Sequence, residues 1–291
     1  MSITASMVKE LRERTGAGMM ECKRALVETN GDPDLAAENL RKAGAAKADK
    51  KAGRVAADGR VVVAQDGSKA VIVEVNSETD FVAKDENFVA FAEAVAAAAL
   101  ASGTTDVAAF ANESLADGQS VEAARTALIQ KVGENIGVRR IESVAGADVV
   151  ASYTHGARIG VVIALDGGDE ALARDVAMHV AAMNPQYIAA ADVPADTLET
   201  ERRILTEQAA ESGKPAEIIE KMVSGRVNKF LKEITLLGQP FVKDDNITVG
   251  KLLDGAGAAV RACVRFEVGE GIEKKQDDFV AEVMAQVKGA S

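Results

Sequence analysis

Tryptophan is absent from this 291-residue chain, and only two tyrosines, eight phenylalanines, two cysteines and two histidines are present. Sites for single-stranded nucleic acid usually stack bases on aromatic side chains, so the scarcity of aromatics disfavours direct binding of DNA or RNA. The cysteines, Cys22 and Cys263, form no CxxC pair, which favours a reducing compartment over a disulfide framework.

An excess of basic charge is also lacking, because 34 Lys and Arg residues face 45 Asp and Glu residues, for a net charge of −11. Nucleic acids and anionic membranes are therefore disfavoured as direct partners. No apolar run reaches transmembrane length, and the N-terminal segment carries acidic residues where a signal peptide has an apolar core. The sequence predicts a cytoplasmic protein.

Motifs for catalysis and for cofactor or metal binding are missing too. His155 and His179 lack metal-ligand spacing, and the glycine-rich residues 254–260 follow a helical pattern, which is the wrong context for a dinucleotide site. His155 is interpreted locally as a turn residue, and His179 as a packed or half-exposed helix residue. We predict no catalytic residues, no cofactor and no metal.

What is present is alanine-rich and helix-forming, which predicts a helix-rich α+β fold. Three short amphipathic stretches predict a three-helix module over residues 1–45, with Met19 and Leu26 on one apolar face of the second helix and the third helix over residues 34–43. Residues 46–60 are rich in Ala, Gly and Lys and predict a linker that tethers this module to the rest.

Two related units of a β-hairpin and a helix follow, and we expect them to form the core. The first covers residues 61–145, and the second covers 146–193 together with 236–268, where "FVKD" and "VRACVRFEVGEG" are expected to be returning strands. When the two copies are aligned on their strands and helices, the segment between strand and helix is five residues longer in the first copy. The excess falls within "SETDFVAKDEN", residues 77–87.

Residues 194–235 predict a protruding antiparallel coiled-coil hairpin, which turns at Gly213-Lys214-Pro215. The apolar seam of its second helix allows two readings, dimerisation or burial within the hairpin itself. Residues 269–291 predict a C-terminal module, with a short amphipathic helix formed around Phe279, Val283 and Val287.

Some apolar side chains have no obvious place in a core. Adjacent helical residues are about 100° apart, so Met19 and Met20 cannot both lie centrally on one buried face, and Phe81 stands in a mostly polar run. Each residue alone is best explained by ordinary packing. Together, they suggest a surface that binds another protein.

Six segments also carry a family resemblance. They are "ELRERTGAGMMECKRAL", "NSETDFVAKDENF", "KVGENIGVRR", "YTHGARIGV", "GQPFVKD" and "RFEVGEGIEKK". In this order, over essentially the whole chain, they resemble the bacterial elongation factor Ts family. The chain departs modestly from the family pattern in residues 101–128, which look several residues longer than expected. The full-length hairpin favours the bacterial over the mitochondrial type.

The resemblance implies a guanine-nucleotide exchange factor that binds elongation factor Tu during translation. It implies a ubiquitin-associated-like N-terminal module and a phenylalanine, here Phe81, that wedges between two helices of the GTPase domain and displaces the elements that hold Mg²⁺ and phosphate. The partner-binding residues that it implies are Arg12, Met19, Met20, Lys23, Thr79, Asp80, Phe81, Val82, Val132 and His155.

Three functions remain as alternatives at this stage. The first is the exchange factor, and the second is an adaptor or chaperone that binds proteins through the N-terminal module and the hairpin without altering a nucleotide. The third, an enzyme using Asp80 or His155, is the weakest, because neither residue has a suitable partner in the sequence. A homodimer or a heterotetramer through the hairpin also stays open.

Overall fold

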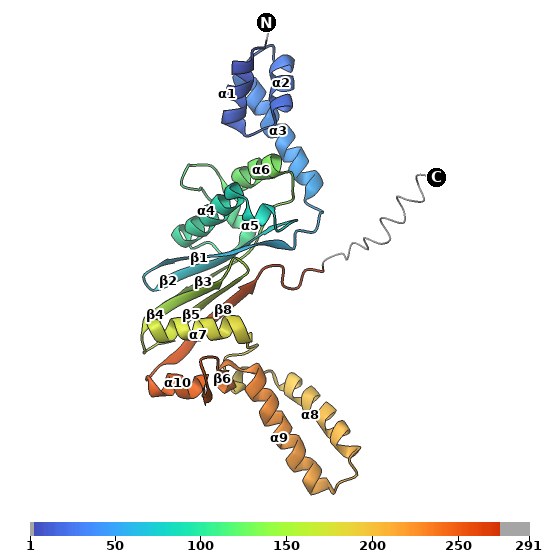
Figure 1. Cartoon of the computed structure of the whole chain (residues 1–291), viewed down its shortest axis with the longest axis vertical. Coiled ribbons are helices and arrows are strands. Elements are labelled where there is room, and N and C mark those ends of the chain that lie inside the picture. The colour runs from blue at the N-terminus through green and yellow to red at the C-terminus, as the bar shows by residue number, and fades with distance from the viewer. Residues whose placement is uncertain (1–2, 274–291) are drawn as a thin grey trace, which may run out of the picture.

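The computed structural model of the chain describes residues 3–273 and has an α+β fold, as predicted. Two three-stranded antiparallel sheets occupy the middle of an elongated body, with a helical module at the N-terminal end and a helical hairpin at the opposite end (Figure 1). The predicted helix around Phe279, Val283 and Val287 lies outside the described residues.

The N-terminal module consists of α1 (Ala5–Thr15), α2 (Met19–Glu28) and α3 (Pro33–Lys51). Local signals define the helix ends: the Thr4 side chain caps α1, Gly16 ends α1 with φ 67°, and Asp32 caps α3 ahead of Pro33. The buried faces share one apolar cluster, which includes Val8, Leu11, Cys22, Leu26, Ala36 and Leu40.

Met19 does not lie on the buried face of α2, which corrects the sequence prediction. Its side chain is 54% exposed, whereas Leu26 on the same expected stripe is fully buried. Met19 is the first residue of α2, and helical side chains lean toward the N-terminus of their own helix. Its side chain is therefore directed past the helix end.

The predicted linker is wrong over residues 46–51, because α3 continues as a helix to Lys51. Alanines favour the helical conformation, and Lys50 and Lys51 in the last turn complement the helix dipole. Ala48 is buried in the apolar cluster of the first core unit. The N-terminal module is thus joined to the core by a continuous helix that packs against it.

The first core unit has a sheet with the strand order β1-β2-β3. The strands are β1 (Asp58–Asp66), β2 (Lys69–Ser77) and β3 (Gly137–Ala145). No strand was predicted where β3 lies, since Arg139, Arg140 and Glu142 interrupt its apolar pattern. Three helices complete the unit: α4 (Glu86–Ser102), α5 (Val107–Phe110) and α6 (Val121–Val132). Its core includes Val71, Val73, Val75, Phe88, Phe91, Val95, Phe110 and Ile129.

The second core unit repeats this order with β4 (Val149–His155), β5 (Ile159–Asp166), α7 (Glu170–Met183) and β8 (Ala259–Glu267). Its sheet order is β4-β5-β8, so the middle strand again leads into a helix, and that helix packs on the first two strands. Eight residues, 78–85, connect β2 to α4, whereas three residues, 167–169, connect β5 to α7. The five-residue excess lies in the connection that carries Phe81, where the sequence comparison placed it.

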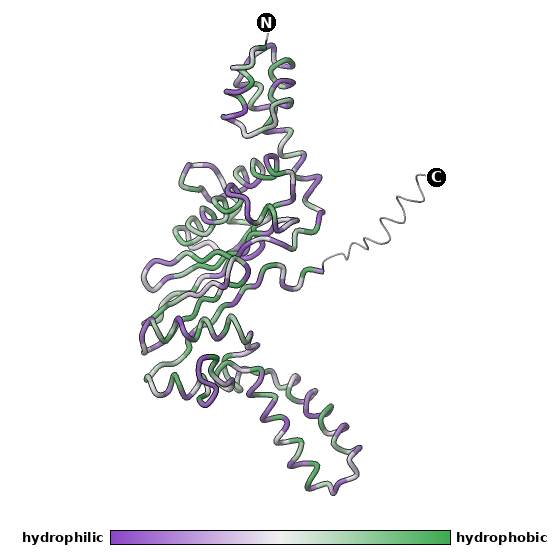
Figure 2. Tube along the Cα trace, viewed as in Figure 1, coloured by the Kyte–Doolittle hydropathy of each residue, from purple (hydrophilic) through white to green (hydrophobic). Residues whose placement is uncertain are grey.

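The helical hairpin is inserted in the second unit between α7 and β8. Its arms are α8 (Ala195–Ala210) and α9 (Ala216–Ile234), and both alternate between hydrophobic and hydrophilic residues (Figure 2). Leu205, Ala209, Val223 and Val227 are buried against one another. The apolar seam of α9 is therefore covered by α8 of the same chain.

The segment after the hairpin corrects a third prediction. "FVKD" was expected to return to the core sheet, but β6 (Pro240–Phe241) pairs with β7 (Asp244–Thr248) in a separate two-stranded sheet, which precedes α10 (Val249–Gly255). His179 of α7 is fully buried and anchors this sheet: Val242 N–H donates to Nδ1 at 3.1 Å, and Nε2 lies 2.9 Å from Gln239 Oε1. Burial lowers the pKa of His179, despite the hydrogen bond to Gln239, in agreement with a neutral ring.

The two core sheets pack face to face. They come close at Gly160 of β5, because a Cβ atom there would lie 2.5 Å from Val61 Cγ1. Val61 N–H also donates to the carbonyl of Ala157 at 2.9 Å. The shared apolar layer consists of Val61, Ala70, Ile72, Val144, Val150, Val162, Ala164, Phe266 and Val268. Strand β2 has helices on one face and the second sheet on the other, which explains its almost continuous burial.

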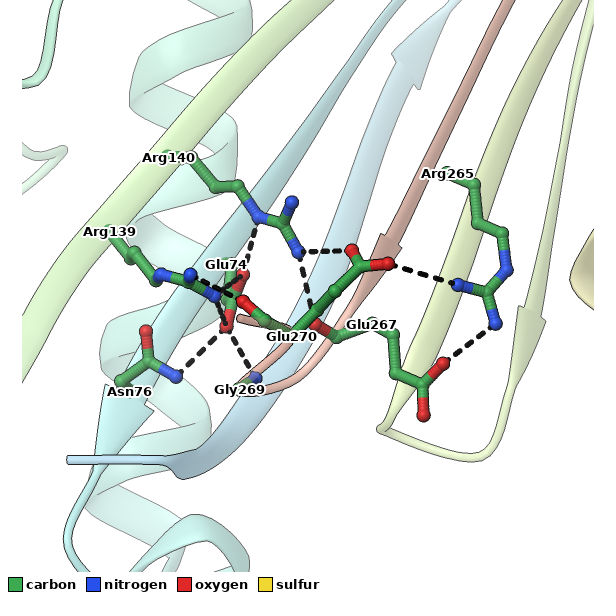
Figure 3. A network of polar contacts seen from close by, with 8 residues as sticks. All are labelled: Glu74, Asn76, Arg139, Arg140, Arg265, Glu267, Gly269 and Glu270. Atoms are coloured by element: carbon green, nitrogen blue, oxygen red, sulfur yellow. Dashed lines mark hydrogen bonds and ion pairs between the residues drawn. The ribbon is translucent and has the colours of Figure 1, made fainter. Parts of the chain in front are cut away.

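A fully buried carboxylate, that of Glu74 in β2, ties the two units together (Figure 3). Glu74 accepts hydrogen bonds from Arg139 and Arg140 of β3, and from the backbone N–H of Gly269 at 2.8 Å, just after β8. Arg140 also donates to the Glu267 carbonyl at 3.0 Å. The segment that follows β8 of the second sheet is therefore held by the Glu74 carboxylate of the first sheet.

Burial alone would raise the pKa of Glu74, but the hydrogen bonds from Gly269, Asn76 and Arg140 outweigh it and lower the pKa. A carboxyl group with a lowered folded-state pKa stabilises the fold fully above its ordinary value, which is 4.5 for Glu. This contribution is lost as the pH falls through the folded-state pKa.

We predict that Glu74→Gln lowers the free energy of unfolding by about 2 kcal/mol at pH 7, because charged hydrogen bonds of a buried carboxylate are lost. The difference from the unsubstituted chain should shrink as the pH falls below 4.5, since Glu74 is then progressively protonated. Urea unfolding at pH 7 and at lower pH measures both values. Glu142→Gln, at an exposed position of β3, is the control, and a difference independent of pH would contradict the assignment.

Candidate partner-binding site

Several large apolar side chains are exposed on the surface of the described chain. Within residues 3–273, no group of three or more His, Cys, Asp or Glu side chains is placed to hold a metal ion, and the helices of this region include none long and apolar enough to span a bilayer. Phe81 is 81% exposed and Met20 is 75% exposed. Apolar side chains presented in this way favour contact with another protein.

Phe81 lies in the connection between β2 and α4, here called the Phe81 loop (residues 78–85). The loop contains a single 3-10 turn, Val82–Lys84, and Asp85 then caps α4. Val82 packs against the first core cluster and Ala83 is buried within it. The residues after Phe81 are thus part of the core, while the Phe81 ring itself is left in solvent.

The residues before Phe81 are held by the segment that follows α6. The carboxylate of Glu134 accepts the Thr79 N–H at 3.0 Å and the Thr79 hydroxyl at 2.7 Å. In return, the backbone N–H of Asn135 donates to the Glu78 carboxylate at 2.6 Å. Both ends of the Phe81 loop are therefore anchored.

Asp80 and Lys84 form an exposed ion pair, 2.6 Å apart, beside Phe81. The hydrogen bond from Lys84 lowers the pKa of Asp80. Both side chains are exposed to solvent, so the pair contributes little to stability. It is available to position a partner through its charges.

The N-terminal candidates form a second exposed group on α1 and α2. Met19, Met20 and Val27 expose more than half of their surface, and Arg12 and Lys23 are exposed around them. Arg12 lines a hollow together with Lys131 of α6, and Lys131 reaches Asn87 at the start of α4 with a distance of 2.5 Å. The hollow therefore borders both the N-terminal module and α6.

The two remaining candidates lie at the same end of the core as Phe81. Val132 is half-buried against the first core cluster and precedes the anchoring residue Glu134 by two positions. His155 is exposed at the end of β4, where its Nδ1 lies 3.3 Å from the Tyr153 hydroxyl. The turn after His155 contacts β1 through Ala157.

Glu134, Glu78 and Asn135 were not predicted as site residues. Glu134 and Asn135 stand inside the motif "KVGENIGVRR", and Glu78 inside "NSETDFVAKDENF". The family motifs therefore contained these positions, but the sequence alone offered no sign that the two motifs meet. Their separation of more than 50 residues along the chain hides the contact.

Comparison with known proteins shows the family of the chain. A family model described as "Elongation factor TS" matches residues 78–270. The chain is 63% identical to the elongation factor Ts of Thioalkalivibrio sulfidiphilus, and both chains are covered completely. It is 58% identical to that of Idiomarina loihiensis and 57% identical to that of Legionella pneumophila (strain Paris), with at least 99% of each chain covered.

These matches define a translation elongation factor, a protein of the protein-biosynthesis machinery. Within that class, the chain belongs to the elongation factor Ts family.

Two phenylalanines close in sequence test whether Phe81 is a surface residue. We predict that Phe88→Ala, at a fully buried position, lowers the free energy of unfolding by about 3–5 kcal/mol. Phe81→Ala should change it by less than about 0.5 kcal/mol, because the ring is mostly in water. Urea unfolding of both variants gives the comparison, and equal losses would mean that Phe81 belongs to the core.

Proposed function

We propose that the chain is a guanine-nucleotide exchange factor for elongation factor Tu and that Phe81 is the side chain that promotes GDP release. The observation that carries the proposal is the presentation of Phe81: its ring is 81% exposed, although the loop around it is anchored on both sides. A large apolar ring held in solvent on an anchored loop is pre-organised, so little ordering entropy is lost when a partner buries it.

The proposed mechanism needs no covalent step. In this family, elongation factor Tu is the partner, and it holds GDP through Mg²⁺ and a phosphate-binding loop. Insertion of Phe81 between two helices of the GTPase domain would displace these elements. Burial of one phenylalanine side chain contributes about 1.5–3 kcal/mol, and each 1.4 kcal/mol of coupling changes nucleotide affinity roughly tenfold.

Thermodynamic linkage adds a requirement to this mechanism. A factor that weakens GDP binding by some ratio must itself bind the GDP-bound partner more weakly by the same ratio than the nucleotide-free form. Both forms are therefore partners, and the tighter complex is the nucleotide-free one. Exchange then follows when GTP displaces the factor.

The other candidates would supply binding area around the wedge. Met19 and Met20 are flexible, polarizable side chains that adapt to a partner surface, with Arg12 and Lys23 as charged neighbours. On the core, Thr79, Asp80, Val82, Val132 and His155 complete the proposed contact set.

The hairpin bears on the oligomeric state. A homodimer, or a heterotetramer with two copies of elongation factor Tu, would have to form through hairpin residues that the partner helix does not already cover. Ile204 and Ile218 are the large apolar side chains exposed on the described hairpin, whereas Val223 and Val227 are buried inside it. Two exposed isoleucines provide little apolar area compared with the interfaces of stable dimers.

We therefore expect the free chain to sediment as a monomer over the micromolar concentration range. Sedimentation velocity at several concentrations measures this directly. A concentration-dependent dimer that disappears in Ile218→Glu would show instead that the hairpin joins two copies.

The exchange reaction itself is tested with elongation factor Tu loaded with a fluorescent GDP. We expect the unsubstituted chain to accelerate GDP release, and Phe81→Ala to lower the rate by about tenfold or more, because the burial of the ring in the complex is lost.

Val242→Ala is the matched control for this experiment, since Val242 is an exposed apolar residue of the small β6-β7 sheet region, on the second core unit. It should release GDP at the unsubstituted rate. If the unsubstituted chain leaves release unchanged, the exchange function is wrong, and a tight complex without release would support the adaptor.

A further inference from the structure

Glu134 is distinguished by the way that it meets the Phe81 loop. Its two carboxylate oxygens accept from two donors of one residue, the backbone N–H of Thr79 at 3.0 Å and its hydroxyl at 2.7 Å. Hydrogen bonds to an ionised acceptor are roughly twice as strong as those between neutral groups. This pair spans 55 residues of sequence and ends two residues before Phe81.

A second contact makes the attachment reciprocal. Asn135, next to Glu134, donates its backbone N–H to the carboxylate of Glu78, next to Thr79, at 2.6 Å. Each of the two segments thus supplies one carboxylate to a backbone N–H of the other. Such a pair of bonds fixes both the distance and the direction between the segments.

The segment that carries Glu134 is itself attached to the end of α3. Lys51 donates to the carbonyl of Gly133, and the side-chain amide of Asn135 donates to the carbonyl of Arg54 at 2.9 Å. Residues 133–135 therefore lie between the helix that bears the N-terminal module and the loop that bears Phe81. Glu134 does not need to contact a partner to affect how Phe81 is presented.

We propose that Glu134 is a positioning residue for nucleotide exchange: it holds Thr79 so that the Phe81 ring is presented in one arrangement before the partner binds. This inference rests on the proposed exchange function. Without the two bonds, the residues before Phe81 sample more conformations, and ordering them on binding reduces the free energy available for displacing the nucleotide-binding elements.

The proposal is tested in the full chain with Glu134→Ala. Amide hydrogen exchange of residues 78–85, measured without any partner, should be faster than in the unsubstituted chain. Release of fluorescent GDP from elongation factor Tu should slow by about tenfold or more, because both charge-assisted hydrogen bonds from Thr79 are lost. Glu86→Ala is the control, because Glu86 is an exposed residue at the start of α4, and both measurements should stay unchanged.

A second pair of variants separates the effect of the Thr79 hydroxyl from the effect of the shape of its side chain. Thr79→Val keeps the volume but removes the hydroxyl that Glu134 accepts, whereas Thr79→Ser keeps the hydroxyl. We expect Thr79→Val to slow GDP release by a smaller factor than Glu134→Ala, because the backbone N–H of residue 79 still reaches Glu134. Thr79→Ser should restore most of the rate.

A double-substitution cycle distinguishes positioning from general damage. If Glu134 acts through Phe81, Glu134→Ala should slow release less than twofold in a chain that already carries Phe81→Ala. Equal losses in both backgrounds would overturn the proposal, and so would unchanged hydrogen exchange of the loop. If the unsubstituted chain does not accelerate GDP release, the proposed function fails, and the positioning role fails with it. Hydrogen exchange then still reports whether Glu134 holds the loop.

Discussion

The buried carboxylate of Glu74 is the constraint on which the relation between the two core units depends. Apolar packing alone allows two sheets to slide and rotate, because it has little directional preference. The hydrogen bonds from Arg139, Arg140 and Gly269 are directional, and they tie β2 to the chain that leaves β8 (Figure 3). An unpaired carboxylate at this depth would be costly, so these contacts have to form together.

The same chemistry recurs at the candidate site on a smaller scale. Glu134 and Glu78 connect the Phe81 loop to the segment after α6, again by carboxylates that accept from backbone N–H groups. A rigid core makes this possible, since both segments leave elements packed in one apolar cluster. Phe81 is therefore exposed on a loop whose other residues are anchored and packed, and not on a loosely packed loop.

Periodic patterns predicted most of the elements, and the errors have identifiable causes. The two units, the helical hairpin and the five-residue excess before α4 follow from local patterns. The length of α3 was underestimated, because an Ala- and Lys-rich segment has no strong periodicity, and its helix depends on burial of Ala48 against the core. Strand β3 escaped notice because two of its arginines serve the buried Glu74.

By itself, the sequence determined the α+β class, the family and the unusual placement of Phe81 in a polar run, because these depend on local pattern and on motifs read in order. Only the tertiary structure decided that the Phe81 ring is exposed, that the hairpin seam is covered within the chain, and that Glu134 meets Thr79. The physical reason is that burial and carboxylate contacts join residues tens of positions apart, and no local pattern encodes which distant segments meet.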